Sequence, residues 1–480
     1  MVDHVYLKRS ETTTQPSQRL THRSRTRTLI PHGWQTVIMF GYPTMLRTLG
    51  GRFSNSQPSH VRQPSPTTPT ISDHRPGTRI DWPDVAKGAC ILLVVLGHVI
   101  GGLQSANLIA DGGRGLYGTV REWVYLFHMP VFFMISGLFF SASIRKGIPS
   151  FLFTRLAGLI YPYVIWTLVI AVCHWLMASH TNSPPDLSRV LRLWYEPYGY
   201  GLWFLYALAI IVVLYAVTRA ACGSDFTFLV VTCLFYALSA CHLFDSWPIA
   251  QKASCCAVYS AFGVVFGERM NRAATSCKSW VLGCVCLTGF ALLTVLFSLC
   301  GSKAGPIAAV GLASIGCVSV WAGAAYLAAA ERHAKGTTSS GNVREEAGSR
   351  QSGRPAEIAC TIGRSCLGCL TMALTPGLKY LGSISLEIYL AHSLLSTLPR
   401  PILTGMLHIR SPHVLVASGF LTGVIGSIIL VNVMDWVRFP YLFRSPLPLR
   451  DAASRASRIH CPSDSVRGLT AQLTHNRSGN

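Results

Sequence analysis

The chain has 480 residues, of which 50% are hydrophobic and only 13% are charged, and its mean hydropathy is +0.38. A soluble domain carries about 25% charged residues, so the composition excludes an ordinary soluble protein and indicates a polytopic membrane protein. The 41 Lys and Arg residues against 20 Asp and Glu give a net charge of +21. Much of this positive charge lies in the tails and inter-helix loops. There it indicates a role in membrane topology and in attracting anionic headgroups or ligands, rather than binding to nucleic acid.

The first segment, residues 1–78, is rich in Ser, Thr, Pro and Arg. Such a composition cannot bury enough apolar surface to fold, so it predicts a disordered, basic N-terminal tail. An alternative is that translation starts later, at Met39 or Met45. Neither interpretation assigns chemistry to this segment.

From residue 85 onward, apolar runs of about 20 residues, the length that a bilayer requires, alternate with short polar breaks. They predict an all-α fold with about ten transmembrane helices. The expected spans are 85–104, 120–142, 152–178, 199–220, 225–243, 252–267, 279–300, 305–329, 379–402 and 413–436. The sixth span is short, and the boundaries of the fifth and sixth can be drawn differently.

The spans define a transmembrane domain over residues 79–437, with a polar cytoplasmic loop at 331–365 and a C-terminal tail at 438–480. Lys and Arg are more frequent in the loops on the same side as the N-terminus. Because such loops stay in the cytoplasm, we expect both termini there.

The first span carries a polar stripe. Lys87 and His98 are eleven residues apart, which at 100° per residue places them on one helix face, roughly 16 Å apart along the axis. Asp84 shares this face. Ionisable groups at bilayer depth are costly, so they are functional candidates. The alternative for His98 is a core histidine that is hydrogen-bonded to a neighbouring helix.

The second span has a similar pair, because Arg121 and His128 are seven residues apart and share a face. This pattern favours a functional site. Pro130 follows closely, however, and a histidine beside a proline can instead satisfy the carbonyl that the proline leaves free.

The ninth span aligns Ser385, Tyr389, His392 and Ser396 at spacings of four, three and four, a polar stripe on an apolar helix. Glu387 points about 140° away from His392 and needs another partner. The alternative to a substrate site is a seam of interhelical hydrogen bonds.

The third span begins with Arg155, near Arg145 and Lys146. Three cations close together suit an anionic ligand such as a phosphate-bearing cofactor, or they set topology and snorkel to the surface. Trp203 and Phe204, at the start of the fourth span, are expected to be interfacial aromatics, with a cavity-lining role as the alternative.

These groups suit acyl transfer. A neutral histidine can take the proton of a hydroxyl that attacks a thioester, and a second donor or cation can stabilise the developing oxyanion. We expect no metal site and no disulfide framework, because the lone CxxC motif, Cys366 to Cys369, lacks a second Cys or His pair. No P-loop or dinucleotide-binding Gly-rich turn is present.

Ordered motifs across residues 79–436 resemble the acyltransferase-3 family of membrane acyltransferases, in particular its stand-alone branch similar to fucose 4-O-acetylase. The motifs are RIDWPDVAKGACILLVVLGH, FHMPVFFMISG, FLFTRLAGLIYPY, LWFLYAL, YSAFGVVFG and LGSISLEIYLAH. The resemblance implies ten transmembrane helices and a cytoplasmic acyl-CoA, usually acetyl-CoA, that acts as co-substrate rather than as a bound cofactor. It also implies a saccharide hydroxyl as the acceptor.

Residue by residue, the resemblance places the family's motif of a basic residue and a histidine on Lys87 and His98, with His98 tied most directly to acyl transfer. Arg155 matches the first of two arginines that often precede the proline of the third span. Gly158 stands where the second is expected, so the details of donor binding do not carry over.

We therefore expect an O-acyltransferase of the cytoplasmic (inner) membrane, in which His98 acts as general base or as acyl relay. The expected catalytic residues are His98, Lys87 and Asp84, the donor-binding residues Arg155, Lys146 and Arg145, and the acceptor-binding residues Arg121, His128, His392, Tyr389 and Glu387. The main alternative is a secondary transporter of a sugar, polyol or acyl group with a histidine proton relay; an inactive family member is a third. The acceptor sugar, the acyl chain length and the oligomeric state stay open.

Overall fold

The computed structural model describes residues 80–109, 115–176, 201–300, 305–341, 371 and 373–446. Within these ranges the chain forms helices and connecting turns, without a strand. Eight helical segments there are long and apolar enough to cross a membrane, and a ninth, shorter apolar helix covers Asp225–Ala240. The prediction of an all-α, multi-pass membrane fold is confirmed.

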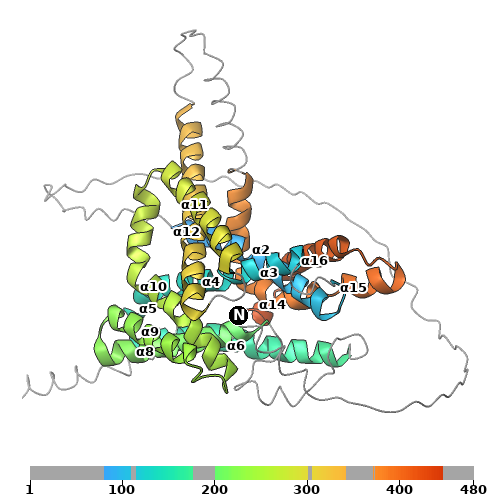
Figure 1. Cartoon of the computed structure of the whole chain (residues 1–480), viewed down its shortest axis with the longest axis horizontal. Helices are drawn as coiled ribbons and strands as arrows, with labels where there is room; N and C mark the ends of the chain where they lie inside the picture. The colour runs from blue at the N-terminus through green and yellow to red at the C-terminus, as the bar shows by residue number, and fades with distance from the viewer. Residues whose placement is uncertain are drawn as a thin grey trace, which may run out of the picture. The chain divides into compact units, whose positions relative to one another are not determined.

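The labelled helices follow the chain as Figure 1 shows. They are α2 (Trp82–Ser105), α3 (Leu116–Tyr125), α4 (His128–Leu138), α5 (Phe140–Ile144), α6 (Ile148–Leu176), α8 (Trp203–Cys222), α9 (Asp225–Ala240), α10 (Pro248–Ser276), α11 (Ser279–Cys300), α12 (Pro306–Gly341), α14 (Ser385–Leu395), α15 (Pro399–Pro401) and α16 (Pro412–Trp436). A further helix covers residues 373–383.

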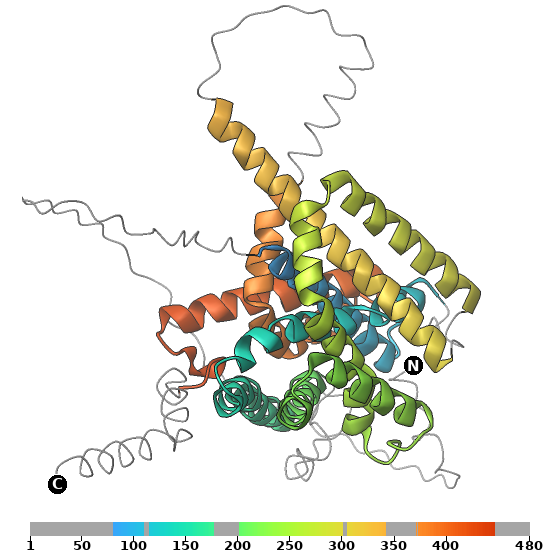
Figure 2. The same ribbon diagram turned by 90° about the vertical axis from the view of Figure 1, so that its left-hand side faces the viewer.

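Helix α2 is the packing centre of the described bundle. It contacts α3, α4, α12, α14 and α16, and its inward side chains are almost fully excluded from solvent, as Ile91 and Val94 illustrate. Around it, α11 packs along α12 (Figure 1) and α6 along α8, a pair that Figure 2 views nearly end-on. Polar residues on α2 are therefore held among helices rather than against lipid.

Two expected spans are interrupted. The span expected at 120–142 consists of α3, α4 and α5, with breaks at residues 126–127 and at Phe139. The span expected at 379–402 is the helix 373–383, a break at Ile384, then α14, α15 and the π-helical turn η3 (Ile402–Met406). Hydropathy marks a buried apolar run but does not report such breaks.

Two helices are longer than predicted. Helix α10 extends well beyond the span expected at 252–267, and α12 reaches Gly341. The segment 331–365 was expected to be a loop, but its first part, up to Gly341, is helical. Residues 342–365 lie outside the described residues. The N-terminal tail, 1–78, and the Cys366–Cys369 motif lie outside them as well.

The segment after α16 folds back onto the bundle. Residues 437–446, which we name the C-terminal strap, contain the short helix η4 (Pro440–Leu442). Tyr161 Oη donates to the carbonyl of Tyr441 at 2.8 Å, and Trp166 Nε1 donates to the carbonyl of Leu442 at 2.9 Å. The tail expected from residue 438 is thus docked against α6 at its start.

Small residues allow α4 and α10 to touch through their backbones. A Cβ on Gly137 would overlap the carbonyl of Ser260, and a Cβ on Gly263 would overlap the carbonyl of Met134. Ser260 Oγ also donates to the carbonyl of Phe133 at 3.1 Å. Close contacts of this kind between small residues are a main source of helix association in membranes.

We expect Gly137→Ala to destabilise the protein by about 1–3 kcal/mol or more, because the added methyl overlaps a backbone atom that cannot move aside. Gly311→Ala on α12 is the matched control, since a Cβ there has no atom within 4 Å. Thermal unfolding in one detergent measures both. Equal unfolding temperatures would contradict the backbone contact of α4 with α10.

Candidate functional site

The histidines of three predicted spans lie in one cluster. The imidazole of His98 on α2 meets that of His392 on α14 edge to face, with ring centroids 4.9 Å apart. Tyr125 bridges to the third histidine, at 6.3 Å from His98 and 5.0 Å from His128. Tyr389 lies 6.0 Å from His392. Segments far apart in the sequence therefore contribute to one polar centre within the bundle.

The three histidines share one hydrogen-bond pattern, in which Nδ1 bonds to the carbonyl four residues earlier. The pairs are His98 with Val94 at 2.9 Å, His128 with Val124 at 2.7 Å and His392 with Ile388 at 3.1 Å. A carbonyl only accepts, so each Nδ1 carries a proton, and in a neutral ring the lone pair is then on Nε2. That lone pair is what a general base requires.

His392 is fully buried, and its Nε2 has no hydrogen-bond partner among the described residues. Leaving a buried polar atom unsatisfied costs about 1–3 kcal/mol. This orphaned nitrogen, on a ring that packs against His98, is thus a candidate to bind a substrate group. The hydrogen bond of His392 Nδ1 to the carbonyl of Ile388 was not expected from the sequence, where a seam of interhelical hydrogen bonds was the alternative to a substrate site.

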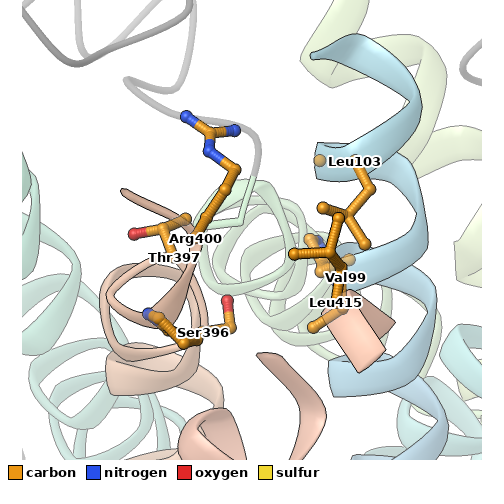
Figure 3. A pocket seen from close by; sticks show the side chains of 9 residues that line it. Val99, Leu103, Ser396, Thr397, Arg400 and Leu415 are labelled. Carbon is orange, nitrogen blue, oxygen red and sulfur yellow. The ribbon is translucent and has the colours of Figure 1, made fainter. Parts of the chain in front are cut away.

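His98 also lines a small pocket of about 40 Å³. Its walls are His98, Val99, Gly102, Leu103, Ser396, Thr397, Pro399, Arg400 and Leu415. In Figure 3, Arg400, Thr397 and Ser396 lie on one side, facing Val99 and Leu103 of α2. The volume holds only a few water molecules, which fits the reacting edge of a substrate rather than a whole sugar ring.

Arg121 reaches the same end of α2. Its Nη1 donates to Gln104 Oε1 at 2.7 Å, and its guanidinium carbon lies 5.5 Å from the centre of the Tyr125 ring. Tyr125 was missed in the sequence, although a signal was present: Arg121, Tyr125 and His128 follow one another at spacings of four and three, which is one helix face.

The opposite end of α2 holds a separate set of charges. Lys87 Nζ pairs with Asp84 Oδ1 at 2.9 Å, and Lys379 Nζ bridges Asp81 Oδ2 at 2.9 Å and Glu331 Oε2 at 2.6 Å. Eleven residues of helix separate Lys87 from His98, which is about 16 Å. Lys87 and Asp84 therefore pair with each other, as their spacing suggested, but they do not touch His98.

Arg155 holds the break between α4 and α5. Its Nη2 donates to Ser143 Oγ at 2.6 Å and to the carbonyl of Phe139 at 3.2 Å. Arg145 and Lys146 are exposed in the adjoining turn. The three predicted donor-binding cations thus lie near the same end of α6. Arg155 is partly buried, whereas Arg145 and Lys146 are exposed.

Gly158, one turn further along α6, faces open space, because a Cβ there has no atom within 4 Å. The position where the resemblance expects a second arginine is therefore unoccupied by other side chains. No described group replaces that arginine at the same place on α6.

Glu387 and Tyr389 anchor α14. The buried Glu387 carboxylate pairs with Arg444 of the C-terminal strap at 3.3 Å, which is the separate partner that its direction required. The Tyr389 hydroxyl donates to the carbonyl of Gly201 and lies 3.3 Å from the backbone nitrogen of Phe204. Both residues therefore bond to protein groups and connect α14 to its neighbours.

Phe204 is buried and contacts Phe133 and Tyr389. The expectation of an interfacial aromatic is wrong for it, because the start of α8 packs against α4 and α14 rather than at a lipid surface. Trp203 is partly exposed, and Lys252 Nζ lies 5.0 Å from its ring centre. Among the residues that the structure describes, no three His, Cys, Asp or Glu side chains gather as a metal ion would require.

We expect Arg444→Gln to lower stability, because it leaves the nearly buried Glu387 carboxylate without its cation. Arg444 is largely exposed, so the coupling is modest, about 0.5–1 kcal/mol. In a double-mutant cycle of thermal unfolding, Arg444→Gln should therefore lower stability less when Glu387 has already been changed to Gln. Additive effects of the two changes would show that the ion pair does not hold the strap to α14.

Comparison with known proteins adds three findings. Residues 80–432, well over half of the chain, match the family described as Acyltransferase domain. Nodulation protein NolL of Mesorhizobium japonicum is 33% identical over 138 residues, a match that covers 27% of this chain and 34% of NolL. The matched segment is thus about a third of that relative's length. No solved structure matches the chain.

Proposed function

The chain belongs to the acyltransferase family, and from that membership we propose that it moves an acetyl group from acetyl-CoA to a hydroxyl of a saccharide. Acyltransferase activity in a multi-pass membrane protein follows from the family and the long apolar helices. The identity of donor and acceptor is our proposal. The observation that supports it is the edge-to-face pair of imidazoles, His98 and His392, of which His98 lines the pocket.

In the proposed reaction, His98 Nε2 takes the proton of the acceptor hydroxyl as its oxygen attacks the thioester carbonyl. The carbon–sulfur bond then breaks, the CoA thiolate leaves and takes the proton from the imidazolium, and the new ester stays on the acceptor. His392 Nε2 accepts a hydrogen bond from a neighbouring hydroxyl and so orients the sugar. The transporter alternative loses its basis, because the family is one of acyltransferases.

We further propose that acetyl-CoA approaches from the end of α2 that carries Lys87. The CoA phosphates would bind Arg155, Lys146 and Arg145, and the pantetheine arm would cover the roughly 16 Å from Lys87 to His98. Since acyl-CoA is cytoplasmic, this end faces the cytoplasm of an inner membrane, with both termini on the same side. The excess of basic residues in these loops supports that orientation.

We expect His98→Ala to lower acetyl transfer by about 10²–10⁴-fold, the usual contribution of a general base. The measurement is transfer of radiolabel from acetyl-CoA into cell-envelope saccharides by membranes that contain equal amounts of folded protein. His242→Ala is the control, because His242 is exposed and pairs with Asp245 away from the cluster. Full transfer by His98→Ala would refute the mechanism.

The same assay separates a general base from an acyl relay. A relay forms an acetyl-imidazole on His98, so label remains on the protein when acetyl-CoA is supplied without acceptor. A general base leaves no label on the protein.

His392→Ala is expected to keep slow transfer with a raised KM for the acceptor, because in the proposed reaction His392 orients the sugar and takes no proton.

We expect Arg155→Gln to raise the KM for acetyl-CoA by about 10-fold or more, since a hydrogen bond to a charged group contributes about 1.5–3 kcal/mol. The KM for the acceptor stays near its original value, and Arg155→Lys restores part of the loss. Arg410→Gln, an exposed arginine before α16, is the matched control. An unchanged KM for acetyl-CoA would place the donor elsewhere.

A further inference from the structure

We propose that the acceptor carries a negative charge, a phosphate or a carboxylate, and that Arg400 binds it in the pocket beside His98. This inference rests on the proposed function, since it names the chemical class of the acceptor for the same site. The charge of the pocket wall, the position of Arg400 and the cost of burying an arginine support it.

The first observation is the composition of the pocket wall. Arg400 is among the nine residues that line it, together with the hydroxyl-bearing Ser396 and Thr397, and none of the nine is acidic. The wall is therefore positive, with hydroxyls that can support a hydrogen-bonding ligand. Such a wall suits an oxyanion better than a neutral or cationic group.

The second observation is how Arg400 is held. Pro399 and Pro401 flank it in α15, and the π-helical turn η3 follows directly. Proline fixes the backbone torsion φ near −65°, so the base of the arginine side chain has little freedom. Its side chain is only partly exposed, and in Figure 3 it rises from the pocket wall opposite Leu103. The chain thus presents a positioned cation.

The third observation is that Arg121 approaches the same stretch of α2 from α3. Its side chain lies against Gly101, with Nε 3.5 Å from the place where a Cβ would be, next to the pocket-lining Gly102. A Cβ on Gly102 would have no atom within 4 Å, so this side of α2 is open. Arg121 therefore lies beside the stretch of α2 that borders the pocket, and Arg400 lies in the pocket wall itself.

The chemistry of the arginine side chain agrees with an anionic ligand. Arginine within a membrane bundle is costly and marks a ligand pathway, and its planar guanidinium matches a carboxylate or phosphate in two parallel hydrogen bonds.

The first test is the charge of the product. Membranes with the wild-type chain or His98→Ala receive radiolabelled acetyl-CoA and a cell-envelope glycan extract, and after removal of residual acetyl-CoA the labelled product is passed over an anion-exchange resin at pH 7. We expect His98-dependent label to be retained. Loss of retention after mild acid identifies a sugar phosphate, whereas loss after carbodiimide-coupled reduction identifies a carboxylate.

A His98-dependent product that passes through the resin as a neutral glycan overturns this inference and leaves the proposed function intact. Absence of His98-dependent label overturns the proposed function, and the inference falls with it. The two failures are therefore distinct.

The second test uses Arg400 itself. We expect Arg400→Gln to raise the KM for the charged acceptor at least 10-fold, with the KM for acetyl-CoA unchanged, and Arg400→Lys to recover part of the loss. The exposed Arg410→Gln is the matched control for a charge removed nearby in sequence. Raised ionic strength should weaken acceptor binding by wild type more than by Arg400→Gln. Equal KM values and equal salt dependence in the two proteins would overturn the assignment.

Discussion

The site depends on a backbone contact between α2 and the helix 373–383. A Cβ on Gly88 would overlap the carbonyl of Leu378, and one on Gly382 would overlap the carbonyl of Asp84, so the two helices touch without intervening side chains. The break at Ile384 then turns the chain, and α14 packs along α2. Only with this turn does His392 reach His98, because an unbroken helix from residue 373 would continue in the direction of its first half.

Charged groups and histidines occupy different stretches of α2. Near its start, Lys87, Asp84 and the Lys379 pairs concentrate charge, whereas the histidine cluster lies about 16 Å further along the axis. In a low-dielectric interior an unpaired charge is expensive. Neutral imidazoles with their Nδ1 protons tied to carbonyls are polar groups that such a position can hold. In the proposed reaction, the position of His98 within the bundle thus favours a base that becomes charged only during the reaction.

Much of the site could be predicted from single helices, and the rest depended on tertiary packing. His98, His128 and His392 were found because an imidazole in an apolar run stands out. Their convergence could not be predicted, since no periodicity within one span reports which face of another it meets. Arg400, near the end of the span expected at 379–402, resembled an ordinary topology-setting charge, and only its place on the pocket wall suggests a further role.

The partner of Glu387 illustrates the same limit from the opposite direction. Its angle on α14 predicted a partner away from His392, and the structure supplies Arg444 from a segment expected to be a free tail. The chain after α16 is docked because Trp166 and Tyr161 bond to its carbonyls, which hydropathy cannot indicate.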